Sequence, residues 1–333
     1  MSGQIAVSGA AALPSAAASA AVAAASRVIT QHSRSFSWAA RLLPAKVRAD
    51  AVVLYAWCRR ADDAVDNAAS VDQARAALGV LQQELDDLYE GREAKDLHLQ
   101  AFADVVRRTA MPKSYPQELL LGMAMDVDGT RYENHDTFLQ YCYRAAGVVG
   151  LMMCHVLGVT SPAALRRACH LGMAMQITNI CRDVPEDWQL GRLYLPRTTL
   201  ERPGLAELCD QLGGPLPQEL APQIAGVVRE LLSEAAVMYI SGQVGLRLLP
   251  GRVALAIGVA QAVYADIGES LRRQDYNPLK GRAFTSTGRK IVLSIKVAAF
   301  MLLDLPRRLL GRGLPPPCRY SQKALEMADL LPY

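Results

Sequence analysis

The chain has 333 residues, a mass of 36.1 kDa and a formal net charge of +4. Hydrophobic residues make up 51% of it and charged residues 20%, which indicates a globular protein with a sizeable core and excludes a disordered one. Basic and acidic residues are nearly balanced and form no long basic block. This excludes an obvious nucleic-acid binder and leaves only a weak attraction to anionic membranes open.

Residues 1–26 consist almost entirely of small residues, with alanine dominating. The segment lacks the positively charged start of a signal peptide, since the first basic residue is Arg27. We therefore predict a disordered Ala-rich extension over 1–26. Seven scattered cysteines without a Cys-x-x-Cys pair fit neither a zinc site nor a disulfide framework, so we expect reduced thiols and a cytoplasmic protein.

From Arg27 onward the apolar residues recur at helical spacing, as in Leu78, Leu81, Leu85 and Leu88. Alternating strand patterns are rare, and no Gly-rich phosphate loop follows a strand. No run of strongly apolar residues is long enough for a transmembrane helix. We predict one all-α domain over 27–310 and a Pro-containing C-terminal tail over 311–333.

The most apolar late stretch is 291–305, which Lys296 and Asp304 interrupt. Such a segment forms either a core helix or a helix lying on a membrane surface. We expect the core helix.

Two aspartates in the first half share a helix face. Asp62 and Asp66 are four residues apart, whereas Asp63 points elsewhere. Like charges at this spacing destabilise a helix slightly, so something should compensate them. For this motif alone, an ordinary solvated face is an equally good interpretation.

A second polar stripe follows an apolar run in the second half. Asn179, Asp183 and Asp187 step by four, and Gln176 falls near the same face. This pattern indicates a polar cavity inside a helical bundle. Because buried unpaired carboxylates are very unfavourable, cations should fill the gap between the two stripes.

Two stripes of oxygen ligands, which no histidine joins, suit Mg²⁺ rather than zinc or di-iron. They predict an enzyme that binds a diphosphate through Mg²⁺ and ionises it. Pro185 should kink or end the second helix near Asp183, because it removes a backbone donor and clashes with the preceding turn. Asp187 is therefore the least secure ligand.

These residues resemble the squalene/phytoene synthase family, and most closely its bacterial phytoene synthases. The second signature comprises Leu171-Gly172, Gln176, Asn179, Arg182-Asp183, Asp187 and Arg192-Leu-Tyr194-Leu-Pro196. The other matching segments are 32–36, 55–66, 125–132, 141–150 and 275–277. Ala145 departs from the valine that the family usually carries. The resemblance covers about residues 27–310.

The resemblance implies a single-domain isoprenoid-synthase (prenyltransferase) bundle around a central cavity. It also implies the head-to-head condensation of two geranylgeranyl diphosphates, through prephytoene diphosphate, to phytoene in carotenoid biosynthesis. The implied cofactor is Mg²⁺, with Mn²⁺ as a substitute. No NADPH is expected, and the chain shows no nicotinamide-binding motif. The very apolar product suggests peripheral contact with a membrane.

The resemblance also assigns roles to particular residues. The metal ligands are Asp62, Asp66, Asn179, Asp183 and Asp187. The substrate-binding residues are His32, Ser33, Arg34, Ser35, Phe36, Tyr55, Arg59, Gln176, Arg182, Arg192 and Tyr276. Tyr141 handles a proton or stabilises a cation, which makes it catalytic together with the four aspartates. The cavity is lined or supported by Met152, Met153, Met173 and Met175.

Several alternatives stay open at this point. Arg34 and Arg59 can be salt-bridge partners, and Tyr55 and Tyr141 can be ordinary packing residues. The product can instead be squalene, presqualene diphosphate or dehydrosqualene made from farnesyl diphosphate, because cavity depth decides chain length. Less favoured are head-to-tail elongation, terpene cyclisation and a non-catalytic interaction protein.

Overall fold

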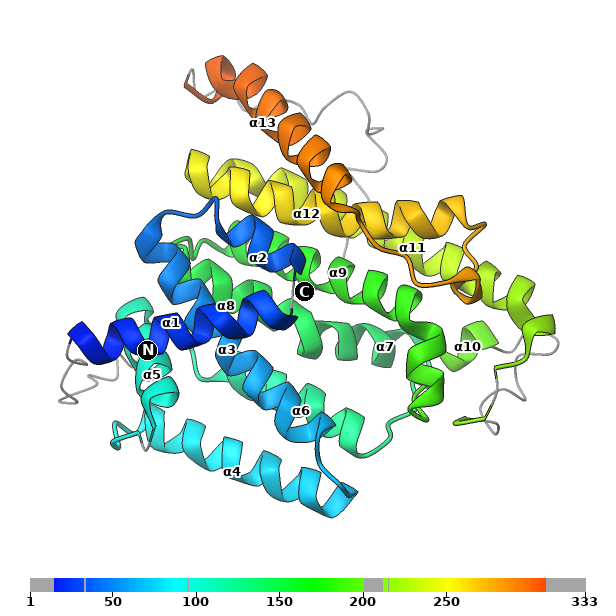
Figure 1. The fold of residues 1–333 in the computed structure, drawn as a ribbon, viewed down its shortest axis with the longest axis horizontal. Coiled ribbons are helices and arrows are strands. Elements are labelled where there is room, and N and C mark those ends of the chain that lie inside the picture. Colours follow the sequence, from blue (N-terminus) through cyan, green and yellow to red (C-terminus); the bar gives the residue numbers. More distant parts are fainter. Residues whose placement is uncertain (1–14, 33, 95, 201–211, 215, 310–333) are drawn as a thin grey trace.

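The computed structural model describes residues 15–32, 34–94, 96–200, 212–214 and 216–309 (Figure 1). Within these ranges every regular element is a helix, which confirms the all-α prediction. The α-helices are α1 Ser15–His32, α2 Arg34–Ala40, α3 Ala45–Asp66, α4 Val71–Tyr89, α5 Leu97–Thr109, α6 Ser114–Val127, α7 His135–Cys142, α8 Val148–Val156, α9 Pro162–Gln189, α10 Arg197–Leu200, α11 Ala221–Gly245, α12 Gly251–Arg273 and α13 Thr287–Leu309. Short turns are η1 Tyr143–Gly147, η3 Gln218–Leu220, η4 Leu246–Leu248 and η5 Pro278–Lys280.

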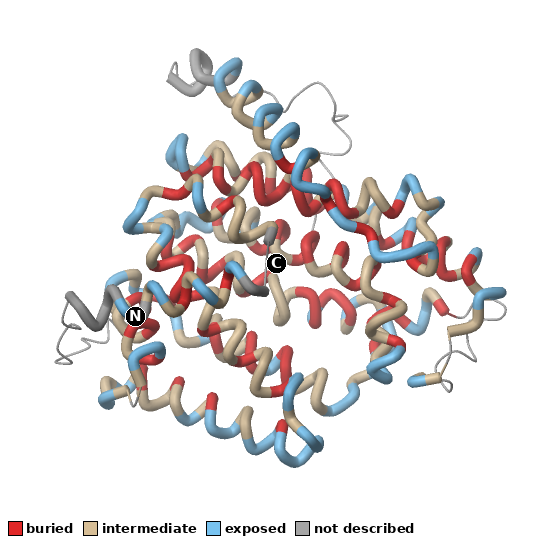
Figure 2. Tube along the Cα trace, in the orientation of Figure 1, coloured by how far each residue is buried: buried red, intermediate tan, exposed pale blue. Residues whose placement is uncertain are grey.

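Helix α9 lies at the centre of the bundle, where it contacts α7, α8, α11 and α12 (Figure 2). Of the two outcomes predicted for Pro185, a helix end near Asp183 was wrong, because α9 continues through the proline to Gln189. Two buried residues flank the proline, Val184 and Trp188, and the Trp188 Nε1 donates a hydrogen bond to the carbonyl of Gly214 at 2.9 Å. Tertiary packing on both sides therefore offsets the local cost of proline, and it keeps Asp187 on the helix.

Two glycines allow α9 to approach η1 and α8 at backbone distance. A Cβ atom at Gly172 would lie 2.2 Å from the carbonyl oxygen of Ala146, and one at Gly150 would lie 2.3 Å from that of Ala168. Real Cβ atoms do not come so close, so any larger residue would push the helices apart. This contact sets the position of the polar stripe one turn further along α9.

A π-helical turn, η1, joins α7 to α8. Such turns insert an extra residue and occur frequently at functional sites. Here Ala145 and Ala146 within the turn line the internal cavity described below. The departure from valine at Ala145 therefore falls on the cavity wall.

The amino-terminal prediction fails in part. Residues 15–26 belong to α1, and Ala25 and Ile29 on this helix are buried in the core. Alanine favours helix strongly, and α1 packs against α3 and α5, which together explain the order of this segment. Residues 1–14 and the predicted tail at 311–333 lie outside the described residues.

Helix α13 is not the core helix that was expected. It packs on α12 with one side only, and large aliphatic residues on its other side are exposed (Figures 1 and 2). None of the helices in the described ranges has the length and apolar character needed to cross a membrane.

Candidate active site

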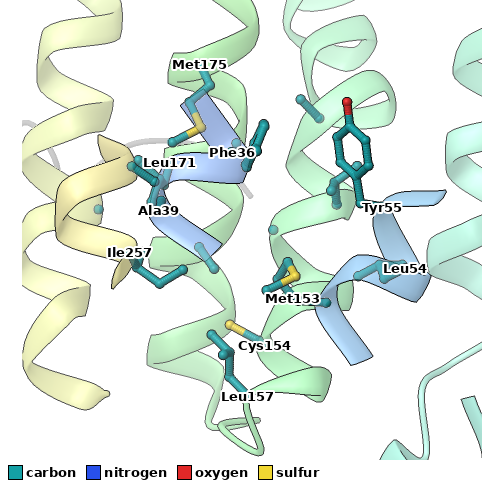
Figure 3. A pocket seen from close by; sticks show the side chains of 18 of the residues that line it. Phe36, Ala39, Leu54, Tyr55, Met153, Cys154, Leu157, Leu171, Met175 and Ile257 are labelled. Carbon is teal, nitrogen blue, oxygen red and sulfur yellow. The ribbon is translucent and has the colours of Figure 1, made fainter. Parts of the chain in front are cut away.

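A cavity of about 300 Å³ runs between α2, α3, α8, α9 and α12. Its walls are mainly alanine, leucine and other apolar residues (Figure 3). Phe36, Tyr55 and Met175 lie towards one end, and Leu157 lies towards the other. The Phe36 ring packs against Tyr55 and Tyr264, at centroid distances of 6.0 and 5.4 Å. The cavity is thus an apolar tunnel with aromatic rings near one end.

The two predicted motifs meet at this cavity. Asp62 from α3 and Gln176 and Asn179 from α9 all line it. The Asn179 Oδ1 atom is buried and accepts no hydrogen bond within the described part of the chain. A buried carbonyl oxygen without a donor is costly, so this atom is suited to a bound cation or ligand.

Three carboxyl groups are held in an environment that disfavours their charge: Asp62, which lines the cavity, and the nearby Asp126 and Asp187, which do not. We call the end of the cavity beside them its mouth. Burial, with the nearby Asp66 and Asp126, raises the pKa of Asp62 to about 7. Burial, with Asp183 and Asp126, raises the pKa of Asp187 to about 7 as well. Burial raises the pKa of Asp126 to about 6. Among the described residues, Asp62 and Asp187 have no ion-pair or hydrogen-bond partner for their side chains.

Arginines pair with the remaining carboxylates. Both Nη atoms of Arg192 lie 3.1 Å from Asp66 Oδ1, which links the loop after α9 to the end of α3. The Arg182 Nε donates to Asp183 at 2.8 Å, and Arg282 lies 3.0 Å from the same carboxylate. The charge of Arg192 also opposes the raised pKa values of Asp126 and Asp187. Arginines therefore surround the carboxylates but leave Asp62 and Asp187 unpaired.

A tyrosine cluster holds Asp126 beside this mouth. The Tyr194 hydroxyl donates to Asp126 Oδ1 at 2.8 Å, and the Tyr141 hydroxyl donates to Oδ2 at 3.1 Å. The Tyr141 and Tyr194 rings stack with centroids 4.9 Å apart, and Tyr132 packs against both. Burial, and then Asp126, raises the pKa of Tyr141 well above its usual value. Tyr141 is thus a neutral hydrogen-bond donor at physiological pH.

The structure brings only some of the predicted substrate residues to the cavity. Phe36, Tyr55 and Gln176 line it, whereas Ser35 lies half-buried on α2. Arg59 pairs with Asp63, and both face a separate hollow between α1, α3 and α5. Ser33 lies outside the described residues, as do the side chains of His32 and Arg34.

The late tyrosine segment is also away from the cavity wall. Tyr276 does not line the cavity, and the guanidinium of Arg229 lies 5.1 Å from the centre of its ring. Met153 and Met175 line the cavity, whereas Met152 and Met173 are buried in the core.

Four residues near the mouth were not assigned a role from the sequence: Asp126, Tyr194, Tyr264 and Arg282. Asp126 and Tyr194 lie within matched segments, yet they share no helix, so spacing cannot connect them. Tyr264 is one apolar position among many on α12. Arg282 reaches Asp183 from the loop before α13, and no local pattern marks it.

The donor set fits a magnesium ion. Asp62, Asp187 and the unpartnered Asn179 Oδ1 offer oxygen atoms only, and burial disfavours the charged form of both carboxyl groups, which a bound cation would offset. Within the described ranges, no three His, Cys, Asp or Glu side chains already converge as a complete metal site. Mg²⁺ commonly keeps several waters and takes further oxygens from a substrate phosphate, which agrees with such an open donor set.

The fold and this donor set define a class of helical synthases. The chain belongs to the squalene/phytoene synthase family, which it matches over residues 29–289. It is 39% identical over 274 residues to the 15-cis-phytoene synthase of Paracoccus sp., an alignment that covers 80% of this chain and 88% of that protein. It is 40% identical over 272 residues to the phytoene synthase of Cereibacter sphaeroides, covering 80% of this chain and 76% of that protein.

Solved structures agree on the architecture. A crystal structure of a dehydrosqualene synthase superposes with a TM-score of 0.75 and 29% identity, covering 86% of this chain and 98% of that one. A squalene synthase from Alicyclobacillus acidocaldarius gives a TM-score of 0.70 at 24% identity, over 80% of this chain and 98% of that one, and so shares the fold. The predicted isoprenoid-synthase bundle around a central cavity is therefore confirmed.

Proposed function

We propose that the chain is a phytoene synthase, which joins two geranylgeranyl diphosphates head to head in carotenoid biosynthesis. The observation that carries this proposal is the meeting of both polar motifs at the mouth of one apolar cavity. The phytoene synthases that match the chain at 39–40% identity support the C40 product over a C30 product.

The aspartates and Asn179 at the mouth are the residues that would hold Mg²⁺. The proposed ligands are Asp62, Asp66, Asn179, Asp183 and Asp187. When bound, the ion stabilises the negative charge that develops on the leaving diphosphate. Mn²⁺ has the same preference for oxygen ligands and is expected to substitute.

Arginines at the mouth are placed to bind the diphosphate groups. Arg182, Arg192 and Arg282 all lie against the proposed ligand carboxylates. A guanidinium pairs with two phosphate oxygens at once, so these side chains can orient a diphosphate as well as neutralise it. Arg59 is held by Asp63 and would have to turn towards the cavity to take part.

The apolar cavity receives the prenyl chains and keeps water from the allylic cation. Phe36, Tyr55 and Tyr264 present aromatic rings near the mouth, where a cation–π interaction favours positive charge. Burial, and then the neighbouring Tyr264, raises the pKa of Tyr55 to about 12, so this ring remains a neutral phenol. The wall thus supplies π-electron density without a competing nucleophilic phenolate.

Tyr141 would act through its hydrogen bond to Asp126. Because the phenol stays protonated, it can donate a hydrogen bond to a departing oxygen or orient the carboxylate, but it does not act as a phenolate base.

We also propose peripheral membrane contact, since a C40 hydrocarbon partitions into a bilayer rather than water.

Product analysis tests this function directly. Purified protein is incubated with Mg²⁺ and either geranylgeranyl or farnesyl diphosphate, without NADPH, and the hydrocarbons are separated by chromatography. We expect phytoene from the C20 substrate. A C30 product alone would show that the cavity selects farnesyl diphosphate, and no product from either substrate would contradict the proposed enzyme.

A further inference from the structure

The outer face of α13 is an exposed apolar surface that the proposed reaction leaves unused. We define it by six residues: Ile291, Val292, Ile295, Ala299, Leu302 and Leu303. The five large side chains among them are between 44% and 80% exposed. At 100° per residue the six occupy an arc of roughly 120°, and between Thr287 and Leu303 this arc contains only one other residue, Gly288. A contiguous apolar surface that is exposed to water marks an interaction site.

The opposite side of α13 is firmly attached to the bundle. Val297 packs against Gly258 of α12, where a Cβ atom would meet it at 3.1 Å. Arg289 pairs with Asp266 of α12 at 2.8 Å, and the Trp38 Nε1 donates to Ser294 Oγ at 3.1 Å. Helix α13 is therefore fixed on the bundle by one side, and within the described ranges no other helix covers its outer face (Figure 1).

The charges on this helix favour an anionic partner. Residues 287–303 contain no acidic residue, and of their three basic residues Arg289 pairs with Asp266 and Lys290 is buried, so Lys296 is the one that a partner can reach. Lys296 is exposed and lies at the edge of the outer face, beside Val292 and Leu303 in the helical projection. A second copy of the chain packed symmetrically on this face would bring like charges together. A bilayer that contains anionic lipids would attract them instead.

We propose that the outer face of α13 docks the protein on the surface of an anionic lipid bilayer. The aliphatic side chains enter the boundary between headgroups and acyl chains, and Lys296 contacts lipid phosphates. Helix α13 contacts α2 and α12, and both of these helices form walls of the cavity. Docking therefore brings these two wall helices close to the bilayer, with α13 in between, an advantage that rests on the proposed function because it concerns release of an apolar product.

Vesicle co-sedimentation of the full chain tests this proposal, without substrate or Mg²⁺. The vesicles contain phosphatidylcholine with about 30% phosphatidylglycerol, which gives their surface a negative charge. The disruptive variant carries Ile295→Asp and Leu302→Asp. Its matched control carries Val71→Asp and Val80→Asp, two exposed aliphatic residues on α4 at the opposite side of the molecule.

We expect the α13 variant to bind vesicles at least about tenfold more weakly than the wild type, because two aspartates cannot enter an apolar boundary. The α4 variant should bind like the wild type. Lys296→Gln should weaken binding about two- to fivefold on anionic vesicles and leave binding to neutral vesicles unchanged. Circular dichroism and thermal unfolding confirm that each variant is folded.

Three results would overturn the proposal. The first is that the wild type fails to bind vesicles at low salt. The second is that the α13 and α4 variants bind equally well. The third is a dimer in sedimentation velocity that only the α13 variant converts to monomer, which would assign the face to a second copy. Since binding is measured without substrate, a failure here leaves the synthase activity untouched. Turnover of detergent-solubilised substrate by the α13 variant tests that activity separately.

Discussion

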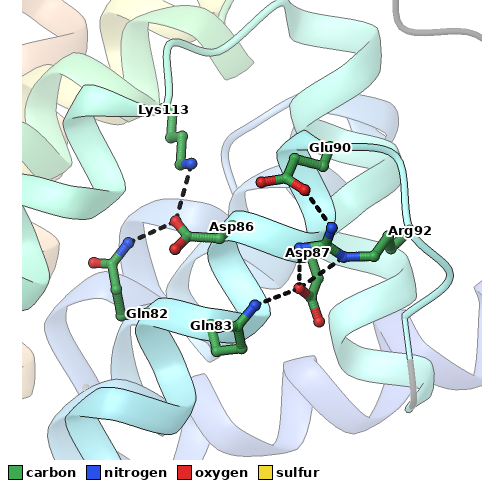
Figure 4. A network of polar contacts seen from close by, with 7 residues as sticks. All are labelled: Gln82, Gln83, Asp86, Asp87, Glu90, Arg92 and Lys113. Atoms are coloured by element: carbon green, nitrogen blue, oxygen red, sulfur yellow. Dashed lines mark hydrogen bonds and ion pairs between the residues drawn. The ribbon is translucent and has the colours of Figure 1, made fainter.

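Two acidic regions of this molecule look alike in sequence and differ in structure. At the carboxyl end of α4, Asp86, Asp87 and Glu90 cluster as closely as the aspartates of α3 and α9. Each of these carboxylates has a partner (Figure 4). Asp86 accepts from Lys113 Nζ at 2.9 Å and from Gln82, and Arg92 pairs with both Asp87 and Glu90. The hydrogen bonds from Lys113 and Gln82 lower the pKa of Asp86.

The cavity mouth shows the opposite balance. Asp62 and Asp187 have no partner within the described residues, and burial raises the pKa of both to about 7. Spacing therefore does not distinguish a site from a solvated face. Burial without an ion-pair partner does, because it leaves unpaired carboxylates, a charge deficit that a bound cation would fill.

The largest expected effect comes from removing one of the unpaired carboxylates. Asp62→Asn should lower kcat/KM for geranylgeranyl diphosphate by at least about 100-fold, because it removes a proposed metal ligand without changing side-chain size. Asp86→Asn on α4 is the matched control and should keep wild-type activity. Equal activity of the two variants would show that the charge deficit at the mouth has no catalytic use.

The pH dependence of stability should sharpen the same contrast. Asp62 and Asp187 have folded-state pKa values of about 7, above the usual value near 4, so the folded state binds more protons. The stability they contribute is full below about pH 4 and is lost as the pH rises through about 7.

The metal-free protein should therefore lose about 1–2 kcal/mol of unfolding free energy between pH 6 and pH 8. Added Mg²⁺ should stabilise the protein more at pH 8 than at pH 6. Urea unfolding at both pH values, with EDTA or with Mg²⁺, measures this. A stability that rises with pH in EDTA would refute the assigned charge deficit.

Arg192 joins the two motifs and should have an intermediate effect. Arg192→Gln removes its ion pair with Asp66 and a guanidinium at the mouth. We expect about a tenfold loss of kcat/KM, expressed mainly in KM, because a group that binds diphosphate acts on ground state and transition state alike. Arg197→Gln, which breaks an exposed pair with Glu133, is the control for a lost surface arginine.

The smallest effect is expected at the end of α4. Arg92→Gln breaks exposed ion pairs with Asp87 and Glu90, and such pairs contribute little to stability because water and salt screen them. Activity should not change, and the melting temperature should fall by no more than a few degrees. A loss of activity here would mean that the α4 region takes part in the function.

Local patterns were enough to predict the helical class, the two motifs and their shared cavity, because helix periodicity places residues four apart on one face. They could not place Asp126 between Tyr141 and Tyr194, which come from three different segments. The expected helix end near Pro185 was wrong because burial of Trp188 and Val184 offsets the local cost of proline in α9. The assignment of 291–305 to the core failed because an apolar run does not reveal how many sides of a helix have partners.

The most direct test of the charge-deficit account is calorimetric titration of Mg²⁺ in the presence of inorganic diphosphate. Three proteins are compared: the wild type, Asp62→Asn with Asp187→Asn, and Asp86→Asn with Asp87→Asn. We predict that the wild type and the α4 variant bind Mg²⁺ with the same affinity, and that the variant at the cavity mouth loses at least about tenfold. Unchanged Mg²⁺ binding by the mouth variant would contradict the account.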